Sequence, residues 1–371
     1  MRHPFTYKLT ALLFALLLLL PTADCMLGLS VSFENTENRQ RLRRPVFEFP
    51  HVMRYKRDFE AYYKQTFGWR DALFQVYSRW KLFVLGQSPL PEKVVIGRQG
   101  WFFLGNSENR VMDQHRGLLP WPADSLTNLL THLHHRQAEL ARYHSQLIVV
   151  VPPDAQSVYS EYLPEQLVNP HRPSRLDVLH RHISRLPGIH FIDLRDTLQA
   201  AKRRYQLYYQ TDTHWNNVGS LVSCAALMKH LHRLNARLPV VDSSAYTITP
   251  SPGFGGDLVR MIGLQQRIKD PLYYNVQRTD GRSLPPPDTL SQRYGSPYPI
   301  LRFTGTDCSQ PRLLFVGDSF SLFVMQYLPH YFSESIFVRD CRLDARLLNA
   351  VKPDIVVFEV VERNINLLSQ L

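Results

Sequence analysis

Cysteine is scarce in this sequence, and its spacing gives no sign of a metal site. The chain has four cysteines in 371 residues, which are Cys25, Cys224, Cys308 and Cys341. No two of them have the close spacing of a zinc site. Two interpretations remain open: one disulfide between Cys308 and Cys341 that leaves Cys224 free, or three buried thiols. We expect no bound metal.

The sequence also lacks the signatures of a nucleic-acid-binding protein. Its formal charge of +11 and its pI of about 9.5 favour anionic partners such as nucleic acid, phospholipid headgroups or acidic polysaccharide. There is no zinc-finger spacing, no aromatic RNA-binding signature and no basic heptad region. No site for coenzyme A is visible either. We therefore expect no nucleic-acid partner and no cofactor, and the charge fits a polyanionic glycan or simple solubility.

A long apolar segment lies at the N-terminus. Arg2 and Lys8 precede an apolar run over residues 9–20, whose length suits the core of a signal peptide. The apolar character then resumes, so that residues 9–33 could cross a bilayer with Asp24 as the one costly interruption. No small-x-small cleavage site stands out. We interpret residues 1–33 as a signal peptide or an N-terminal membrane anchor, and the anchor is favoured.

Two short motifs carry the residue types needed for acyl transfer. The apolar run 313–316 predicts a buried strand, and it leads into Gly317-Asp318-Ser319-Phe320. A serine on a turn that opens a helix has backbone N–H groups close to the oxygen that becomes charged. Upstream, Asp212 and His214 are separated by one residue, so the carboxylate can orient the imidazole towards a serine. Together the motifs predict a Ser-His-Asp triad for acyl transfer or ester hydrolysis.

These motifs resemble the SGNH-hydrolase-like O-acetyltransferases of the alginate AlgX and AlgJ type. The resemblance covers most of the chain after residue 34. It rests on five motifs in the order of that family: 67–71 (FGWRD), 95–103 (VIGRQGWFF), 212–215 (DTHW), 255–258 (GGDL) and 317–319 (GDS). In ordinary SGNH hydrolases the Gly-Asp-Ser element comes first, so the order here resembles a circularly permuted arrangement.

The resemblance implies roles for individual residues. It implies that Ser319 is the nucleophile, His214 the general base and Asp212 the acid that orients His214. One departure is the absence of a lysine from 151–156 (VPPDAQ), where the family tends to carry one. The candidates for oxyanion stabilisation or substrate binding are Gly255, Gly256, Arg260, Trp215 and Tyr273. The glycines would allow the backbone to approach a ligand closely.

The order of predicted elements indicates an α/β fold. Strands and helices alternate over most of residues 91–371, which favours a three-layer α/β/α domain with a mostly parallel sheet. The strands are expected at 147–151, 190–194, 313–316, 335–338 and 354–358. A segment at about 242–311 is rich in Pro, Gly, Tyr and Ser, and we interpret it as a loop insertion over the active-site face.

Residues 34–90 form a helical lead-in segment in this interpretation. Its apolar residues have mostly helical spacing and are expected to form core: Phe59, Tyr62, Tyr63, Phe67, Leu73, Val76, Tyr77 and Trp80. Near the C-terminus, Glu359, Glu362 and Arg363 are expected to pair with one another at the end of the last strand.

The favoured function is an O-acetyltransferase that modifies an exported polysaccharide through an acetyl-serine intermediate. The resemblance also implies a periplasmic location, an anchor in the inner membrane and a membrane-bound acetyl-donor transporter of the O-acyltransferase type. The arginines that follow the apolar segment oppose this orientation by the positive-inside rule; they are Arg39, Arg41, Arg43 and Arg44. The alternatives are a carbohydrate acetyl esterase with the same triad, and a non-catalytic glycan-binding subunit of a secretion complex.

Overall fold

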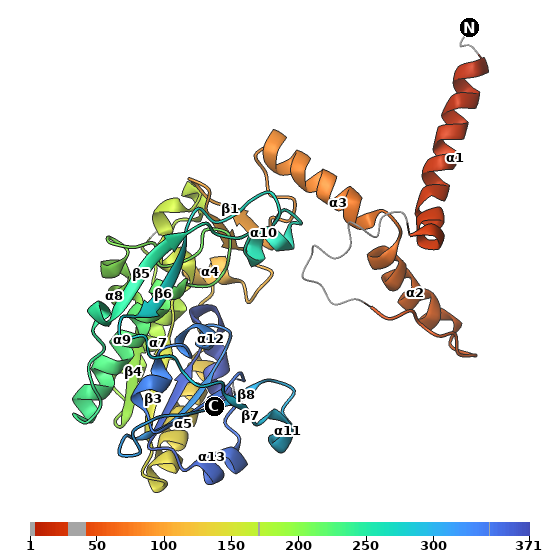
Figure 1. The fold of residues 1–371 in the computed structure, drawn as a ribbon. Helices are drawn as coiled ribbons and strands as arrows, with labels where there is room; N and C mark the ends of the chain where they lie inside the picture. The colour runs from red at the N-terminus through yellow and green to blue at the C-terminus, as the bar shows by residue number, and fades with distance from the viewer. Residues whose placement is uncertain (1–3, 29–41, 170, 341) are drawn as a thin grey trace.

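The structure is a computed structural model that describes residues 4–28, 42–169, 171–340 and 342–371. Its first part is helical and contains α1 (Pro4–Leu27), α2 (Val52–Thr66), α3 (Arg70–Arg79) and the π-helix η2 (Trp80–Val84). Within α1, Tyr7–Asp24 are long and apolar enough to cross a membrane. The last part of the predicted span, residues 29–33, lies outside the described residues. Figure 1 shows α1 and α2 standing away from the main body of the molecule.

The expectation that the aromatic stripe of this part forms core is wrong. No residue of α2 is buried, and the stripe of α3 and η2 is exposed, with Trp80 at 50% and Val76 at 62%. Helical spacing shows that one face of a helix is apolar. It does not show whether another part of the same chain covers that face, and here the helices project from the body (Figure 1).

A sheet of seven strands forms the centre of the body. Its order is β4-β3-β11-β9-β10-β8-β7, in which the first five strands are parallel and β8 is antiparallel to both of its neighbours, β10 and β7. The strands are β3 (Gln146–Val151), β4 (Ile189–Asp193), β7 (Asp288–Thr289), β8 (Ile300–Thr304), β9 (Arg312–Gly317), β10 (Glu334–Val338) and β11 (Ile355–Glu359). The prediction of a mostly parallel sheet is therefore confirmed.

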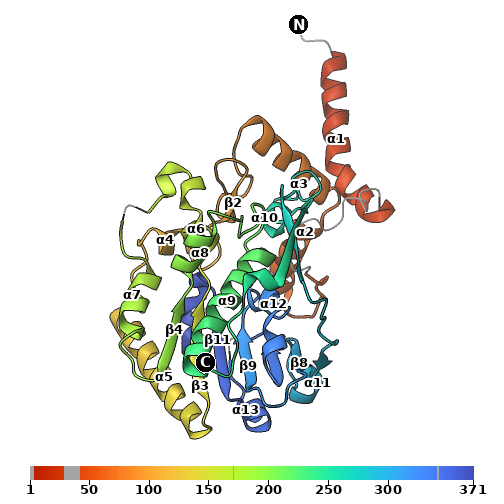
Figure 2. The ribbon, with the colours of Figure 1, turned by 60° about the vertical axis from the view of Figure 1, so that its left-hand side comes forward.

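Alternate residues along each strand enter two separate cores. Val150, Phe315 and Val357 belong to the core under α9, whereas Val149 and Val316 belong to the core on the opposite face. Helices on the first face are α6 (Ala155–Val158), α8 (Arg195–Ala201), α9 (Asn217–Leu234) and α12 (Ser321–Val324). Helices on the second face are α5 (Ala123–Arg142), α7 (Arg175–Ile183) and α13 (Ala345–Val351). Figure 2 shows these helices around the central strands, as a three-layer domain requires.

The remaining elements are short. They are β1 (Val94–Ile96), β2 (Phe102–Leu104), α4 (Val111–His115), η3 (Ser160–Tyr162), η4 (Glu165–Leu167), η5 (Ser243–Ala245), β5 (Tyr246–Ser251), α10 (Asp257–Met261), β6 (Tyr273–Arg278), α11 (Ser291–Tyr294), η6 (Leu328–Tyr331) and η7 (Glu362–Gln370). β1 and β2 form an antiparallel hairpin. The segment 242–311 contains more regular structure than a loop insertion, because β5 pairs with β6 and β7 and β8 extend the central sheet.

Cys224 and Cys308 are free thiols. Cys224 is buried in α9, and Cys308 is exposed. Cys341 lies outside the described residues. The proposed Cys308–Cys341 disulfide is therefore not seen at Cys308, and the alternative of three buried thiols fails because Cys308 is at the surface.

Candidate active site

Ser319 lies directly beyond the carboxyl end of β9, in the middle of the sheet. Binding sites of open α/β sheets lie at this edge. The turn that carries Ser319 is held by Asp318, whose Oδ1 accepts a hydrogen bond from the Phe320 N–H at 3.0 Å. The helix predicted to follow Ser319 is present but short, since α12 has four residues and starts at Ser321. The position of Ser319 is therefore set by β9 and the turn after it, and not by a long helix.

His214 approaches Ser319 from the loop that precedes α9. Asn216 starts this helix, because its Oδ1 accepts from the N–H groups of Val218 and Gly219 at 3.0 Å. Nε2 of His214 lies 2.8 Å from Oγ of Ser319, and Nδ1 lies 2.7 Å from Oδ1 of Asp212. A carboxylate only accepts hydrogen bonds, so Nδ1 carries the proton in that pair and Nε2 is left to accept from the serine hydroxyl.

A second carboxyl group lies near the same ring nitrogen of His214. Oδ2 of Asp257 is 3.9 Å from Nδ1 of His214, and Asp257 accepts from the N–H of Thr213 at 2.8 Å and from its hydroxyl at 2.7 Å. Burial and the charge of Asp212 raise the pKa of Asp257. Burial also opposes ionisation of Asp212, but the hydrogen bond and the charge of His214 outweigh burial and lower the pKa of Asp212. Asp212 thus favours its ionised form and Asp257 its neutral form, and Asp212 is the one paired with His214.

The loop 255–258 holds Asp212 in place. The Asp257 N–H donates to Oδ2 of Asp212 at 2.9 Å, and the Gly256 N–H donates to Oγ1 of Thr211 at 2.9 Å. A Cβ on Gly256 would come within 2.6 Å of the Asp212 Cβ and of the Thr211 carbonyl oxygen. The sequence predicts that these glycines allow the backbone to approach a ligand; what the structure shows at Gly256 is a close approach to the loop of Asp212. The Gly256 N–H is engaged there, not free for an oxyanion.

The other predicted binding residues lie in different environments. Trp215 is fully buried and packs against the Phe320 ring, with centroids 5.0 Å apart, so it is not available to a substrate. Gly255 is also buried, and a Cβ there would clash with Gln265. Arg260 is exposed at the end of α10. Tyr273 is half-buried, and its hydroxyl accepts from Nδ2 of Asn217 at 3.1 Å.

Asp212, His214 and Asp257 have the residue types of a metal site. Their ligand atoms lie within 4.8 Å of one another. Every carboxylate oxygen of this group already accepts a hydrogen bond from the protein, as Asp212 does from His214 and Asp257, and Asp257 does from Thr213. Nδ1 of His214 carries the proton that it donates to Asp212, so it could bind a metal ion only after losing that proton and that hydrogen bond. The donor set therefore fits proton transfer between Ser319 and His214 better than metal binding.

The expectation for Glu359, Glu362 and Arg363 is wrong. Nη1 of Arg363 pairs with Oδ1 of Asp154 instead, and Oε2 of Glu362 accepts from the Asp154 N–H at 3.0 Å. Oε1 of the buried Glu359 has no hydrogen-bond partner among the described residues. Helical or strand spacing cannot reveal these contacts, because Asp154 is more than 200 positions away in the chain.

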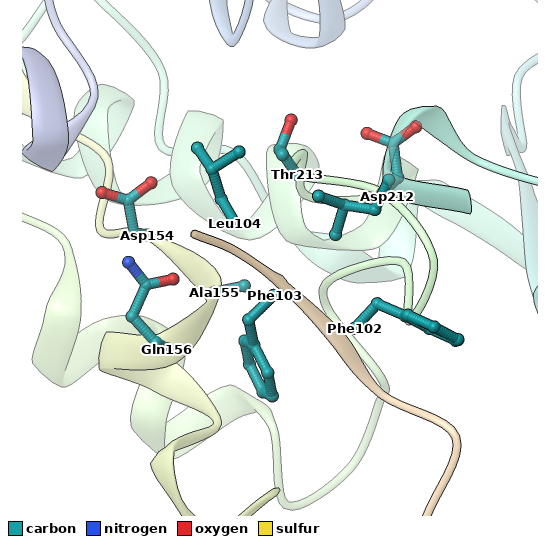
Figure 3. A pocket seen from close by; sticks show the side chains of 9 residues that line it. Phe102, Phe103, Leu104, Asp154, Ala155, Gln156, Asp212 and Thr213 are labelled. Atoms are coloured by element: carbon teal, nitrogen blue, oxygen red, sulfur yellow. The ribbon is translucent and has the colours of Figure 1, made fainter. Parts of the chain in front are cut away.

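A small pocket connects Asp154 with the triad. Asp154 and Asp212 both line it, together with Leu104 and Thr213. In the view of Figure 3, Leu104 and Thr213 lie between the two carboxylates, and the Phe103 side chain points away from them. No role for Asp154 or Asp257 is predicted from the sequence, although the glycines before Asp257 mark a close approach of the backbone.

The sequence is similar to proteins that carry the name of an alginate O-acetylase. The chain is 28% identical over 217 residues to "Probable alginate O-acetylase AlgJ" of Pseudomonas putida, which covers 55% of this chain and 48% of the relative. It is 27% identical over 239 residues to the protein of the same name of Pseudomonas aeruginosa, covering 62% of this chain and 55% of the relative. The chain thus spans about half the length of these curated relatives.

Solved structures share the fold. PatB1 of Bacillus cereus matches 74% of this chain and 98% of its own, with a TM-score of 0.55 and 14% identity. A DHHW family protein of Eubacterium siraeum matches 75% of this chain and 95% of its own, with a TM-score of 0.51 and 18% identity. At these identities the likeness concerns the fold alone. The family model described as "SGNH hydrolase-like domain, acetyltransferase AlgX" matches residues 94–338, which include Asp212, His214 and Ser319. The chain therefore belongs to the AlgX family of SGNH hydrolase-like acetyltransferase domains.

Proposed function

We propose that this protein is an O-acetyltransferase that acetylates hydroxyl groups of an exported polysaccharide, with Ser319 as the nucleophile, His214 as the general base and Asp212 as the acid that orients the base. The observation that carries the proposal is the continuous chain of contacts from Oδ1 of Asp212 through the imidazole to Oγ of Ser319, at 2.7 and 2.8 Å. Both distances are within hydrogen-bonding range, as a nucleophile and its base require.

In the first step, Oγ of Ser319 attacks the carbonyl carbon of an acetyl donor while its proton passes to Nε2 of His214. The tetrahedral intermediate then collapses, and the leaving group of the donor departs with that proton. Ser319 now carries the acetyl group as an ester. The ionised Asp212 stabilises the imidazolium that forms between these two events.

In the second step, a sugar hydroxyl attacks the acetyl-serine and gives its proton to Nε2 of His214. Collapse of the second tetrahedral intermediate returns the proton to Oγ and releases the acetylated sugar. The Ser319 N–H makes no hydrogen bond within the part of the chain that the structure describes, so it is available to an oxyanion. The Gly256 N–H does not serve as a second donor, because it is bound to Thr211.

Three exposed cations in the segment after Asp257 support an anionic acceptor. Arg260, Arg267 and Lys269 follow Asp257 in the chain and are exposed. None of the three forms an ion pair among the described residues. Unpaired cations in this position attract a polyanion to the site. Phe254 lies on the same loop, is 47% exposed and packs against Tyr209, which offers a surface for a sugar ring.

The apolar helix α1 supports a position at a membrane, with the catalytic body on the periplasmic side. The acetyl donor would then come from a membrane-bound transporter of the O-acyltransferase type, because acetyl-coenzyme A is confined to the cytoplasm. "Probable alginate O-acetylase" in the names of the relatives supports an alginate-like acceptor. Residues 1–33 would serve as the signal or anchor, 34–90 as a helical lead-in and 91–371 as the catalytic domain.

The test is intact mass spectrometry of the full chain in detergent, after incubation with an activated acetyl ester. Wild type and Ser319→Ala are compared with and without anionic oligosaccharides. An acetyl adduct that requires Ser319 and moves onto the sugar supports transfer. Loss of the adduct to water alone favours the esterase. If the folded wild type gives no adduct, the triad does not catalyse and the non-catalytic binding role becomes the leading alternative.

A further inference from the structure

The segment that follows β11 contacts both the end of β3 and the turn that carries Ser319. Residues 360–364, called the β11 exit segment below, run beside the end of β3: the Val360 N–H donates to the Val150 carbonyl at 3.1 Å, and the Glu362 N–H donates to the Pro152 carbonyl at 2.8 Å. This places the segment between the end of β3 and the end of β9, where Ser319 lies, because β11 lies between these two strands in the sheet.

Asp318 joins the nucleophile turn to the β11 exit segment. Oδ2 of Asp318 accepts from the Val361 N–H at 2.9 Å and from Nδ2 of Asn364 at 3.5 Å, while Oδ1 accepts from the Phe320 N–H. The Asp318 side chain therefore holds Phe320, the residue after Ser319, and also bonds to the β11 exit segment. The position of Ser319 depends on that of the exit segment.

Arg363 joins the exit segment to the end of β3. Its guanidinium pairs with Oδ1 of the buried Asp154, and its N–H donates to Oδ2 of the same carboxylate at 2.9 Å. Burial disfavours the charge of Arg363, but the carboxylates of Asp154 and Asp318 outweigh burial and raise its pKa. The arginine side chain is 11% exposed, so a substrate does not reach most of it.

Arg363 also contacts the residue that follows the nucleophile. Its Cζ lies 5.5 Å from the centre of the Phe320 ring, which is in the range of a cation–π contact. The Phe320 ring is fully buried and lies 5.1 Å from the His214 ring. Phe320 thus separates the guanidinium from the imidazole, and it is bonded covalently to Ser319.

We propose that Arg363 is a positioning residue, which acts through Asp154 and Phe320 to keep Oγ of Ser319 within hydrogen-bonding distance of Nε2 of His214. Arg363 touches no reacting atom. Its removal leaves the exit segment, to which Asp318 attaches the Ser319 turn, bound to the end of β3 by backbone hydrogen bonds but without the guanidinium contacts to Asp154 and Phe320. Small displacements of a nucleophile from its base reduce the rate strongly while leaving the binding of a small ester unchanged.

The inference rests on the proposed role of Ser319, and an organophosphonate probe that modifies activated serines tests both separately. The second-order rate of Ser319 modification is measured by mass spectrometry on the full chain, for wild type, Arg363→Gln and Arg363→Lys. If the folded wild type is not modified at Ser319, the proposed function fails. If wild type is modified, we expect a loss of about tenfold to a hundredfold in Arg363→Gln, with part of the rate kept in Arg363→Lys.

Loss of the arginine also leaves Asp154 buried without its partner, which lowers stability by itself. The double variant Asp154→Asn/Arg363→Gln removes both charges, and we expect it to regain thermal stability but not the rate of modification. Recovery of the rate together with stability, or an unchanged rate in Arg363→Gln, would overturn the inference. The exposed pair Asp344 and Arg346 on α13 provides the control Asp344→Asn/Arg346→Gln, for which the rate of modification stays at that of wild type.

Discussion

The backbone N–H of Asp257 donates a hydrogen bond of 2.9 Å to Oδ2 of Asp212, the carboxylate paired with His214. A residue 45 positions downstream thus fixes the orientation of the candidate triad acid. The approach is close because Gly256, the preceding residue, has no Cβ to collide with Asp212.

Gly256→Ala is expected to displace the loop of Asp212. The added Cβ would lie 2.6 Å from atoms of Asp212 and Thr211, and overpacking of this kind costs about 1–3 kcal/mol. We expect acetylation of Ser319 to slow by about a hundredfold, measured by intact mass over time. Gly281→Ala is the control, since Gly281 has a φ of +67° and no neighbour within 4 Å. It should lose stability through backbone strain and retain the acetylation rate; equal rate losses in both variants would contradict the expectation.

Asp212→Asn and Asp257→Asn separate the two carboxyl groups beside His214. Asp212 lies 2.7 Å from Nδ1, whereas Asp257 lies 3.9 Å away and is bonded to Thr213. Loss of the orienting carboxylate is expected to lower kcat by about a thousandfold to ten-thousandfold. For Asp257→Asn we expect kcat to fall by less than about tenfold. Burial and the charge of Asp212 raise the pKa of Asp257 and so favour its neutral form, which an asparagine resembles. The rate of hydrolysis of an activated acetyl ester measures kcat for both variants. A larger loss in Asp257→Asn than in Asp212→Asn would assign the orienting role to Asp257.

Glu359→Gln is expected to make the protein more stable at neutral and alkaline pH. Glu359 is 1% exposed, and burial together with the charge of Asp318 raises its pKa well above the ordinary 4.5. A carboxyl group whose pKa is raised by folding contributes full stability below 4.5 and loses that contribution as the pH rises towards its folded pKa.

The stability gain in Glu359→Gln should therefore be on the order of 1 kcal/mol or more above neutral pH. It should vanish in acid. Thermal unfolding of both proteins from acidic to alkaline pH checks this. A difference that does not change with pH would show that Glu359 does not titrate as its burial suggests.

Replacing Arg260, Arg267 and Lys269 by Gln is expected to weaken binding of an anionic oligosaccharide. Each removed charge should raise KM by up to about fivefold, and the effect should shrink at high salt because ions screen exposed charges. Acetylation of Ser319 by a small neutral ester should not change.

Two comparisons complete the experiment on these cations. An uncharged oligosaccharide should show no difference between the proteins. Arg282→Gln is a matched control because it removes another exposed arginine, one that pairs with Asp280. Equal KM values for the anionic oligosaccharide in the triple variant and wild type would remove these cations from acceptor binding.

Most of the central sheet follows from local sequence signals. The runs at 147–151, 313–316 and 355–358 are continuously apolar because strands covered on both faces need apolar residues on both sides. The structure has strands at each of these places. The short strand β7 has two residues, and its pairing with β8 depends on a partner elsewhere in the chain, so local spacing could not reveal it.

The helical lead-in shows the opposite case. The spacing of Leu73, Val76 and Trp80 predicts an amphipathic helix, and the helix is present. Burial of that face is a tertiary property, and these three side chains are exposed. A periodic pattern shows that a helix has an apolar face, but it does not show which part of the chain, if any, covers that face.

The α/β class, the order of the motifs and the candidates Asp212, His214 and Ser319 can be read from the sequence, because each motif consists of characteristic residue types at short spacing. The contact of Gly256 with Asp212, the burial of Trp215 and the pairing of Arg363 with Asp154 become visible only in the folded protein. These contacts join residues that are far apart in the chain. The sheet brings them together by aligning the ends of β3, β11 and β9 at one edge, and no local pattern records which side chains meet there.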